Sequence, residues 1–160
     1  MKRGLMALAI AGLAATACAI LITVLANRDQ SQVHSEDLAA LEPDRGANHP
    51  NGPPTPASPP AQPPTSGPHR PELIEKDQTE LSDDQILEAL HLGNIVIAYE
   101  DDPPTDLQQD EFSPDLAAAG QAVILDHRPG IGPTTALAWR RRSTERLSEF
   151  IDAYLGQAPG

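Results

Sequence analysis

The sequence is poor in cysteine and in basic residues, and each shortage excludes a class of protein. Its one cysteine, Cys18, cannot form an intramolecular disulfide, so any folded part must be held together by packing alone. Lys and Arg number 11 against 23 Asp and Glu, which gives a net charge of −12. Because phosphate binding needs a surplus of basic side chains, this charge argues against a nucleic-acid partner.

Aromatic residues are also scarce, and their positions indicate where a core can form. All five lie between Tyr99 and Tyr154. Since aromatic side chains bury large areas, we expect the packed core in this C-terminal part. Seventeen prolines and eleven glycines are too many for a uniformly folded globule of 160 residues. The sequence therefore predicts a folded domain preceded by segments of another kind.

One long uncharged apolar run lies near the N-terminus, between Leu5 and Ala26. As a helix it would be roughly 33 Å long, which matches the hydrocarbon thickness of a bilayer. Lys2 and Arg3 precede it, and the positive-inside rule then places the N-terminus in the cytoplasm. We predict a transmembrane signal anchor over residues 5–26, with residues 1–4 as a cytoplasmic tip and the remainder outside the plasma membrane.

Two other interpretations of this run stay open. Cleavage after Ala26 would make the run a signal peptide, although the apolar region of a signal peptide is usually about 7–15 residues long. Alternatively, Cys18 is the acylated residue of a lipoprotein, but the apolar run continues beyond it as far as Ala26. The length of the run and the charges before it favour the anchor.

A proline-rich segment follows the apolar run. Eleven prolines lie between Pro43 and Pro71. Because proline fixes φ and lacks an amide donor, neither a helix nor a sheet can persist in such a segment. An extended polyproline II conformation is expected instead. Composition therefore predicts a proline-rich stalk over residues 28–72, and a folded domain over roughly residues 73–160.

Helix and strand signals alternate in this C-terminal part. Ser82, with Gln85 three residues later, has the spacing of a capping box, and Gly93 is placed to end the helix. Further elements are predicted by the apolar runs and their breaks: strands at 95–99, 122–125 and 134–142, helical segments within 106–119 that are interrupted at Pro114, and a helix at 143–155. Together they predict a small α+β domain in the order α-β-α-β-β-α, with helices covering about three strands.

The last helix has the clearest amphipathic pattern. Its apolar residues recur at the spacing of one helix face, and Ser143 is placed to cap it. They are Leu147, Phe150, Ile151, Tyr154 and Leu155. Leu137 and Trp139 share one face of the preceding strand, so we expect Trp139 to contact this helix.

Four short segments, taken in order, resemble a known bacterial family. They read PPTSGPH at 63–69, HLGNIVIAY at 91–99, ALAW at 136–139 and FIDAYLGQAP at 150–159. In this order they are similar to the family called domain of unknown function 3105, whose members are often anchored by one N-terminal helix. The resemblance implies a fold and a location rather than an activity. It also implies that the PPTSGPH segment belongs to the domain, so that the disordered stalk covers residues 28–61 and the domain covers residues 62–160. Its motif residues here are Pro63, Pro64, Thr65, Ser66, Gly67, Pro68, His69, Gly93 and Trp139.

The family also carries a Glu-His-Gly triplet before its central strand. In this chain the triplet is His91-Leu92-Gly93, so Leu92 takes the place of the family histidine. A site built on that histidine is therefore not transferred to this chain.

Three histidines outside the predicted stalk are candidates for chemistry: His69, His91 and His127. Together with Asp126 they can converge on a divalent metal, because imidazole and carboxylate are usual ligands. No two of these histidines have the spacing of a metal motif, so the sequence gives no positive signal for one. His34 and His49 lie in the predicted stalk and are assigned no role.

Two other polar groups have simpler interpretations. Ser66 is expected to form a turn, because its surroundings lack the strand–elbow–helix pattern of a hydrolase nucleophile. Residues 140–142 are three arginines, which can bind an anion. We expect them instead to pair with the acidic residues 100–102 or to be solvated.

Two functions remain. The first is a membrane-anchored extracytoplasmic module of the bacterial cell envelope, which binds another envelope protein or a cell-wall component. No catalytic residue and no cofactor is assigned to it, and a non-enzymatic role is favoured. The alternative is a metal-binding or hydrolytic domain that uses His69 with His91 or His127.

The predicted topology can be tested with a reporter fused after Gly160. We expect the reporter to be active only outside the cytoplasm, and the full-length protein to remain in the membrane pellet. Recovery of a soluble form that starts at Asn27 would show that the apolar run is a cleaved signal instead.

Overall fold

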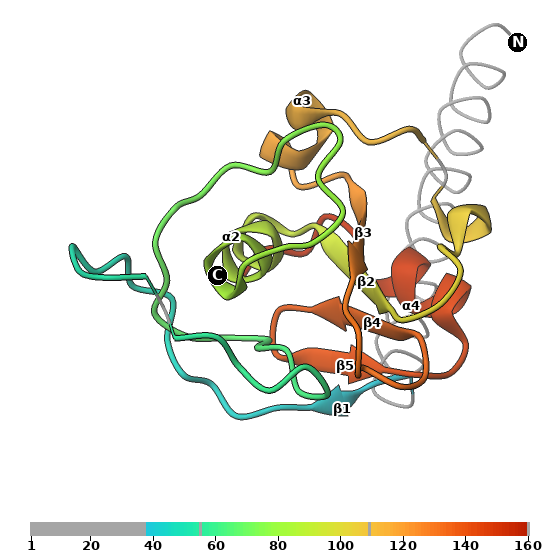
Figure 1. The fold of residues 1–160 in the computed structure, drawn as a ribbon, viewed down its shortest axis with the longest axis horizontal. Coiled ribbons are helices and arrows are strands. Elements are labelled where there is room, and N and C mark those ends of the chain that lie inside the picture. Colours follow the sequence, from blue (N-terminus) through green and yellow to red (C-terminus); the bar gives the residue numbers. More distant parts are fainter. Residues whose placement is uncertain (1–37, 55, 109, 160) are drawn as a thin grey trace, which may run out of the picture. The chain divides into compact units, whose positions relative to one another are not determined.

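The structure is a computed structural model that describes residues 38–54, 56–108 and 110–159 (Figure 1). The predicted cytoplasmic tip and transmembrane anchor, residues 1–4 and 5–26, lie outside this range. None of the helices in the described ranges has the length and apolar character needed to cross a membrane. The described residues have a mixed α+β fold, so the predicted fold class is confirmed.

A five-stranded sheet forms the centre of the fold (Figure 1). Its strands lie in the order β1-β5-β4-β2-β3. Only β2 and β3 pair in parallel, with Ile95 opposite Val123, and the other pairs are antiparallel. The strands are β1 (Ala40–Leu41), β2 (Ile95–Tyr99), β3 (Val123–His127), β4 (Thr135–Ala138) and β5 (Arg141–Ser143).

Three helices accompany the sheet: α2 (Asp83–Leu92), α3 (Pro114–Ala118) and α4 (Leu147–Tyr154), with a 3-10 turn at Thr105–Leu107. The start of α2 is as predicted, because the Gln85 amide donates to the Ser82 hydroxyl and the Ser82 amide donates to the Gln85 side chain. Its end is also as predicted, since Gly93 takes a φ of +100° in the left-handed region.

Both faces of the sheet are covered, α2 lying on one and α4 on the other (Figure 1). Successive residues of β2 point to opposite faces, so Val96 packs with α2 whereas Ile95 and Ile97 pack with α4. A strand that is buried on both faces has no polar side. This is why β2 appears in the sequence as a continuous apolar run.

The sheet has five strands rather than the predicted three. Residues 134–142 are not one strand: the chain turns back at Trp139 and Arg140, and β4 and β5 form a hairpin. Arg140 has a φ of +58°, a conformation more typical of glycine or asparagine. The predicted cap at Ser143 is also wrong, because Ser143 ends β5 and α4 begins four residues later.

The expected contact between Trp139 and the last helix is wrong for a related reason. Leu137 and Trp139 do lie on the same side of the sheet, as their spacing predicts. That side is covered by α2, however, while Phe150, Ile151 and Tyr154 of α4 pack on the other side. The alternation of residues along the strand therefore predicted correctly that Leu137 and Trp139 share a face. It did not predict which helix covers that face.

Residues 38–49, which we call the strap, belong to the domain rather than to a disordered stalk. β1 pairs with β5 in this segment, Ala40 opposite Arg142. Beyond β1, the Glu42 carboxylate accepts a 2.6 Å hydrogen bond from the Thr65 hydroxyl. The Pro43 carbonyl accepts one of 2.9 Å from Ser66. No proline lies between residues 38 and 42, so an edge strand can form there despite the overall composition.

The α4 side of the core supplies a direct test of this packing. Phe150 is fully buried, and replacing a buried aromatic with alanine typically costs about 3–5 kcal/mol. The total free energy of unfolding of a domain is only about 5–15 kcal/mol. We therefore expect Phe150→Ala to shift the urea midpoint strongly downward, as followed by Trp139 fluorescence.

Leu73→Ala is the matched control, because this side chain is 88% exposed and its loss should change stability by less than about 0.5 kcal/mol. Equal midpoints for the wild type and Phe150→Ala would show that α4 does not pack on the sheet.

Candidate metal centre

Helix α2 presents two potential ligands beside each other. Glu88 and His91 are three residues apart, so they are neighbours on the helix surface. The opposite side of α2 is fixed in the core by Ile86 and Leu90, neither of which is exposed to solvent. The two polar side chains are therefore carried by a rigid, well-packed element.

His69 is the most deeply placed of the candidate residues, since its side chain has no solvent exposure. Its Nδ1 lies 2.9 Å from the Gly67 carbonyl oxygen. A carbonyl can only accept, so Nδ1 carries a proton and donates it, which leaves the Nε2 lone pair of the neutral ring free. A backbone partner of this kind is typical of metal-binding histidines, because it fixes the tautomer and the ring orientation.

The backbone on either side of the PPTSGPH segment is held by the first turn of α2. Asp83 accepts a hydrogen bond from the Ser58 amide, and Asp84 accepts one from the Arg70 amide. Both carboxylates are buried. They also lie at the positive end of the helix dipole, where negative charge is stabilised. These two contacts fix the chain that carries His69 across the start of α2.

A buried ion-pair network extends from Asp83. The Arg128 guanidinium pairs with Asp83 at 2.8 Å and with Asp126 at 3.3 Å. Burial raises the pKa of Asp126, while hydrogen bonding from the Leu81 amide and the charge of Arg128 oppose that rise. Asp126 is therefore committed to holding the chain around residue 81 and is not free to act as a metal ligand.

The strap brings a third histidine to His69 and Glu88. The backbone amide of His69 donates to the Asn48 carbonyl, which sets the next residue, His49, over the site. His49 Nε2 lies 3.2 Å from His69 Nε2 and 3.5 Å from Glu88 Oε2. His69 Nε2 is 3.1 Å from the same Glu88 oxygen. Three donor atoms from three separate segments thus form a small triangle.

With His91 the site has four donors, one from each residue, and all of these atoms lie within 4.8 Å of one another. Ligands at about 2.0–2.1 Å from a tetrahedral zinc ion are roughly 3.3 Å apart. The three distances among His49, His69 and Glu88 fall close to this value. Three of the four donors thus have the spacing of metal ligands, and the set of three imidazoles and one carboxylate suits a transition metal in its chemistry.

The electrostatics of the site also favour a cation. Because Nδ1 donates to Gly67, a neutral His69 ring presents its Nε2 lone pair to the Glu88 carboxylate at 3.1 Å, and two electron-rich atoms then oppose each other. Such a contact is stable only when a proton or a metal ion lies between the two atoms. Burial lowers the pKa of His91, and the charges of His69 and His49 lower it further, while Glu88 raises it. The lowered pKa favours the neutral ring of His91, which is the form that binds metals.

Trp139 closes the apolar side of the cluster. Its ring centroid lies 5.4 Å from that of His91 and 6.2 Å from that of His69. An apolar group beside a metal site limits the access of water and strengthens electrostatic interactions there. Trp139, which was predicted to pack on α4, therefore lies beside the histidine cluster instead.

The structure separates the three histidines proposed from the sequence. His69 and His91 lie in the cluster, but His127 does not: its ring contacts the Glu100 carbonyl and lies 3.5 Å from Glu80. Sequence reasoning missed His49 and Glu88. The Glu88–His91 spacing is a local signal that could have been found, whereas nothing near His49 in the sequence indicates its role.

The remaining motif residues have structural roles. The Ser66 hydroxyl donates to the Pro43 carbonyl and accepts from the Arg45 amide. These two hydrogen bonds hold the strap, so Ser66 has a structural role. A side chain at Gly93 would meet the backbone of Gly156 and Ala158 at 3.1 Å, so the left-handed cap is also a close contact. Both residues shape the domain around the site.

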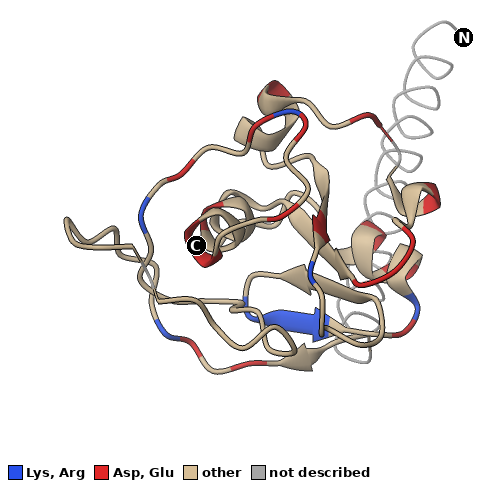
Figure 2. Cartoon of the chain, in the orientation of Figure 1, with Lys and Arg blue, Asp and Glu red and all other residues tan. Residues whose placement is uncertain are grey.

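The arginine cluster pairs with the strap, not with residues 100–102. Arg142 pairs with Glu42 at 2.8 Å, and Arg140 with Asp44 at 3.3 Å. Figure 2 shows the basic residues of β5 beside these acidic groups. Arg141 lies over the Tyr154 ring, 5.7 Å from its centroid. The expected pairing with residues 100–102 is therefore wrong, because the acidic partners come from the strap.

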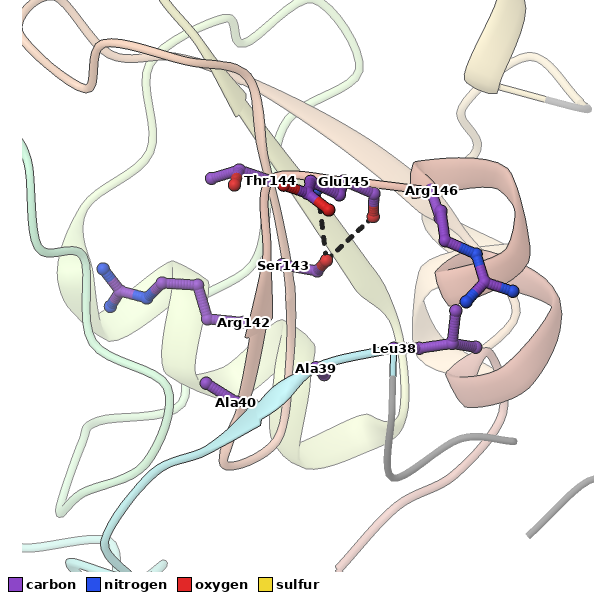
Figure 3. Close-up of a pocket in the computed structure, with 8 residues that line it drawn as sticks. All are labelled: Leu38, Ala39, Ala40, Arg142, Ser143, Thr144, Glu145 and Arg146. Atoms are coloured by element: carbon purple, nitrogen blue, oxygen red, sulfur yellow. Dashed lines mark hydrogen bonds between the residues drawn. The ribbon is translucent and has the colours of Figure 1, made fainter. Parts of the chain in front are cut away.

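A pocket of about 240 Å³ beside β1 is a weaker candidate site (Figure 3). Two arginines line it, but Arg142 already binds Glu42 and the Pro63 carbonyl, and Arg146 pairs with Glu149. The Ser143 hydroxyl is bonded to the backbone of Glu145 (Figure 3). Since its polar groups already have partners within the chain, this pocket lacks the convergent donors of the histidine cluster.

Comparisons with known proteins give no assignment: no family model, no curated protein and no solved structure matches this chain. The similarity to the family with the PPTSGPH segment therefore stays a proposal. The four converging donors are therefore the feature that points to a function.

The lowered pKa of His91 predicts how acid affects the metal-free protein. In the unfolded chain the pKa of this histidine is about 6.5, whereas in the folded protein its pKa is lower. The unfolded state then holds more protons, so stability should fall as the pH drops below about 6.5. Urea midpoints measured across this range should show the loss, and His91→Asn should make the dependence shallower. An unchanged dependence would mean that His91 is not shielded as described.

Proposed function

We propose that this protein binds a divalent transition-metal ion through His49, His69, Glu88 and His91. The observation that supports this proposal most strongly is the convergence of four donor atoms within 4.8 Å, contributed by three separate segments of the chain. Clusters of exposed acidic groups are common without an ion. Here, however, a fully buried imidazole faces a carboxylate that is only 17% exposed. Such a cluster is costly to build unless a cation compensates it.

The donor set narrows the choice of ion. Calcium and magnesium prefer sites made of oxygen ligands, and three imidazole nitrogens do not suit them. Imidazole suits zinc, copper, nickel and iron. No cysteine lies in the described ranges, so the thiolate ligands that select copper(I) are not supplied there. Zinc(II) is therefore a suitable first probe, with copper(II) as its main competitor because it binds such sites most tightly.

We further propose that the site is displayed outside the plasma membrane. This rests on the apolar run from Leu5 to Ala26, the positive charges before it and the PPTSGPH resemblance. A metal-binding domain anchored in this way would serve the cell envelope, through an envelope protein or a cell-wall component as partner. The strongly acidic composition supports a role in attracting cations, because negative charge raises their local concentration.

Zinc content tests the proposed function. The purified full-length protein, dialysed against zinc and then against buffer, should retain one ion per chain by elemental analysis. His69→Ala should abolish this stoichiometric binding, because it removes the buried ligand. Glu88→Gln keeps the size of the side chain but removes its charge, so we expect the affinity to fall by more than about tenfold.

His127→Ala is the matched control, since this histidine lies outside the cluster and its loss should leave one zinc bound. If the wild type retains no zinc or copper, or if His127→Ala loses as much zinc as His69→Ala, the proposed site is wrong.

A further inference from the structure

The four ligands of the proposed metal centre are not held equally. We propose that His49 is the exchange ligand: it leaves the ion first and opens a coordination position to solvent, while His69, Glu88 and His91 retain the ion. This inference rests on the proposed metal-binding function. A site of this kind binds and releases an ion reversibly, whereas a structural site holds its ion permanently.

Three of the ligands are carried by backbone that is fixed by contacts other than those with the ion. His69 is fully buried, and its second ring nitrogen is bound to the Gly67 carbonyl. Glu88 and His91 are one turn apart on α2, whose apolar side is fixed in the core. His69 therefore cannot leave the site without breaking a buried hydrogen bond, and the backbone that carries Glu88 and His91 cannot move without disturbing the packing of the domain.

His49 is held differently. Its side chain is 39% exposed, and its ring contacts the three other members of the site, which are His69, Glu88 and His91. Among the described residues, its Nδ1 has no hydrogen-bond partner of the kind that Gly67 provides for His69. Ligands that lack such an outer partner are oriented less firmly. Rotation of the His49 side chain alone can therefore remove it from the ion.

The backbone around His49 permits this rotation without detachment of the strap. Before it, the Asn48 carbonyl accepts from the His69 amide, and Glu42 and Pro43 are bonded to the PPTSGPH segment. After it, residues 50–54 are exposed, and a side chain added at Gly52 would meet nothing within 4 Å. The strap thus presents His49 at the edge of the site, with open space on its far side.

An ion with three protein ligands and one open position is chemically different from one held by four. Closed four-ligand zinc sites are structural, whereas sites with three protein ligands keep a position for water or another ligand. Departure of His49 converts the first kind into the second. An incoming donor, such as an imidazole of an acceptor, can then bind the ion before the other three ligands release it.

Release kinetics test the proposal in the full-length protein loaded with zinc. An excess of a chromogenic chelator captures the ion as it leaves, and stopped-flow absorbance gives the rate. We expect His49→Ala to retain one zinc per chain but to release it at least about tenfold faster than the wild type. Added free imidazole should fill the vacant position in His49→Ala and slow the release, with little effect on the wild type.

His127→Ala is the control for loss of a histidine, and it should release zinc at the wild-type rate. A wild-type rate in His49→Ala, a failure of imidazole to slow its release, or a loss of zinc as complete as in His69→Ala would overturn the assignment of His49. Those results would leave the metal centre itself standing. A wild type that binds no metal, or a His127→Ala variant that loses as much zinc as His69→Ala, would overturn both proposals.

Discussion

The arrangement of this domain depends on the burial of one imidazole, that of His69. A buried polar ring needs a partner for each nitrogen, and an unsatisfied one costs roughly 1–3 kcal/mol. The Gly67 carbonyl satisfies Nδ1 from within the same segment. Nε2 instead faces groups from elsewhere, Glu88 on α2 at 3.1 Å and His49 on the strap at 3.2 Å. The ring therefore joins three segments, and the donors that stabilise it are the donors that form the proposed metal centre.

Local signals in the sequence predicted much of the fold. Ser82, Gln85 and Gly93 define the ends of α2 because capping involves residues only a few positions apart. The parts that were missed depend on distant partners. β1 forms only because Ala40 meets Arg142 across the sheet, about a hundred residues along the chain. The β4–β5 turn places Arg140 at a positive φ, which an arginine does not signal.

The residues of the candidate site also fall into two groups, those with a local signal in the sequence and those that depend on distant contacts. His69 and His91 could be named from the sequence because they lie in or beside recognisable motifs. Their convergence could not be predicted, since it depends on how the PPTSGPH segment crosses the first turn of α2. His49 was hidden by its surroundings: a proline-rich composition predicts an extended chain, and it does not show that this chain is docked. Side-chain bonds from Thr65 and Ser66 dock it without regular secondary structure.

We have proposed that His69, Glu88, His91 and His49 surround one metal ion. Anomalous diffraction at the zinc absorption edge, from crystals of the zinc-loaded protein, can locate that ion. We expect a single strong peak about 2.0–2.2 Å from a nitrogen of each histidine and an oxygen of Glu88. A zinc peak bound elsewhere on the acidic surface, with none between these side chains, would contradict it.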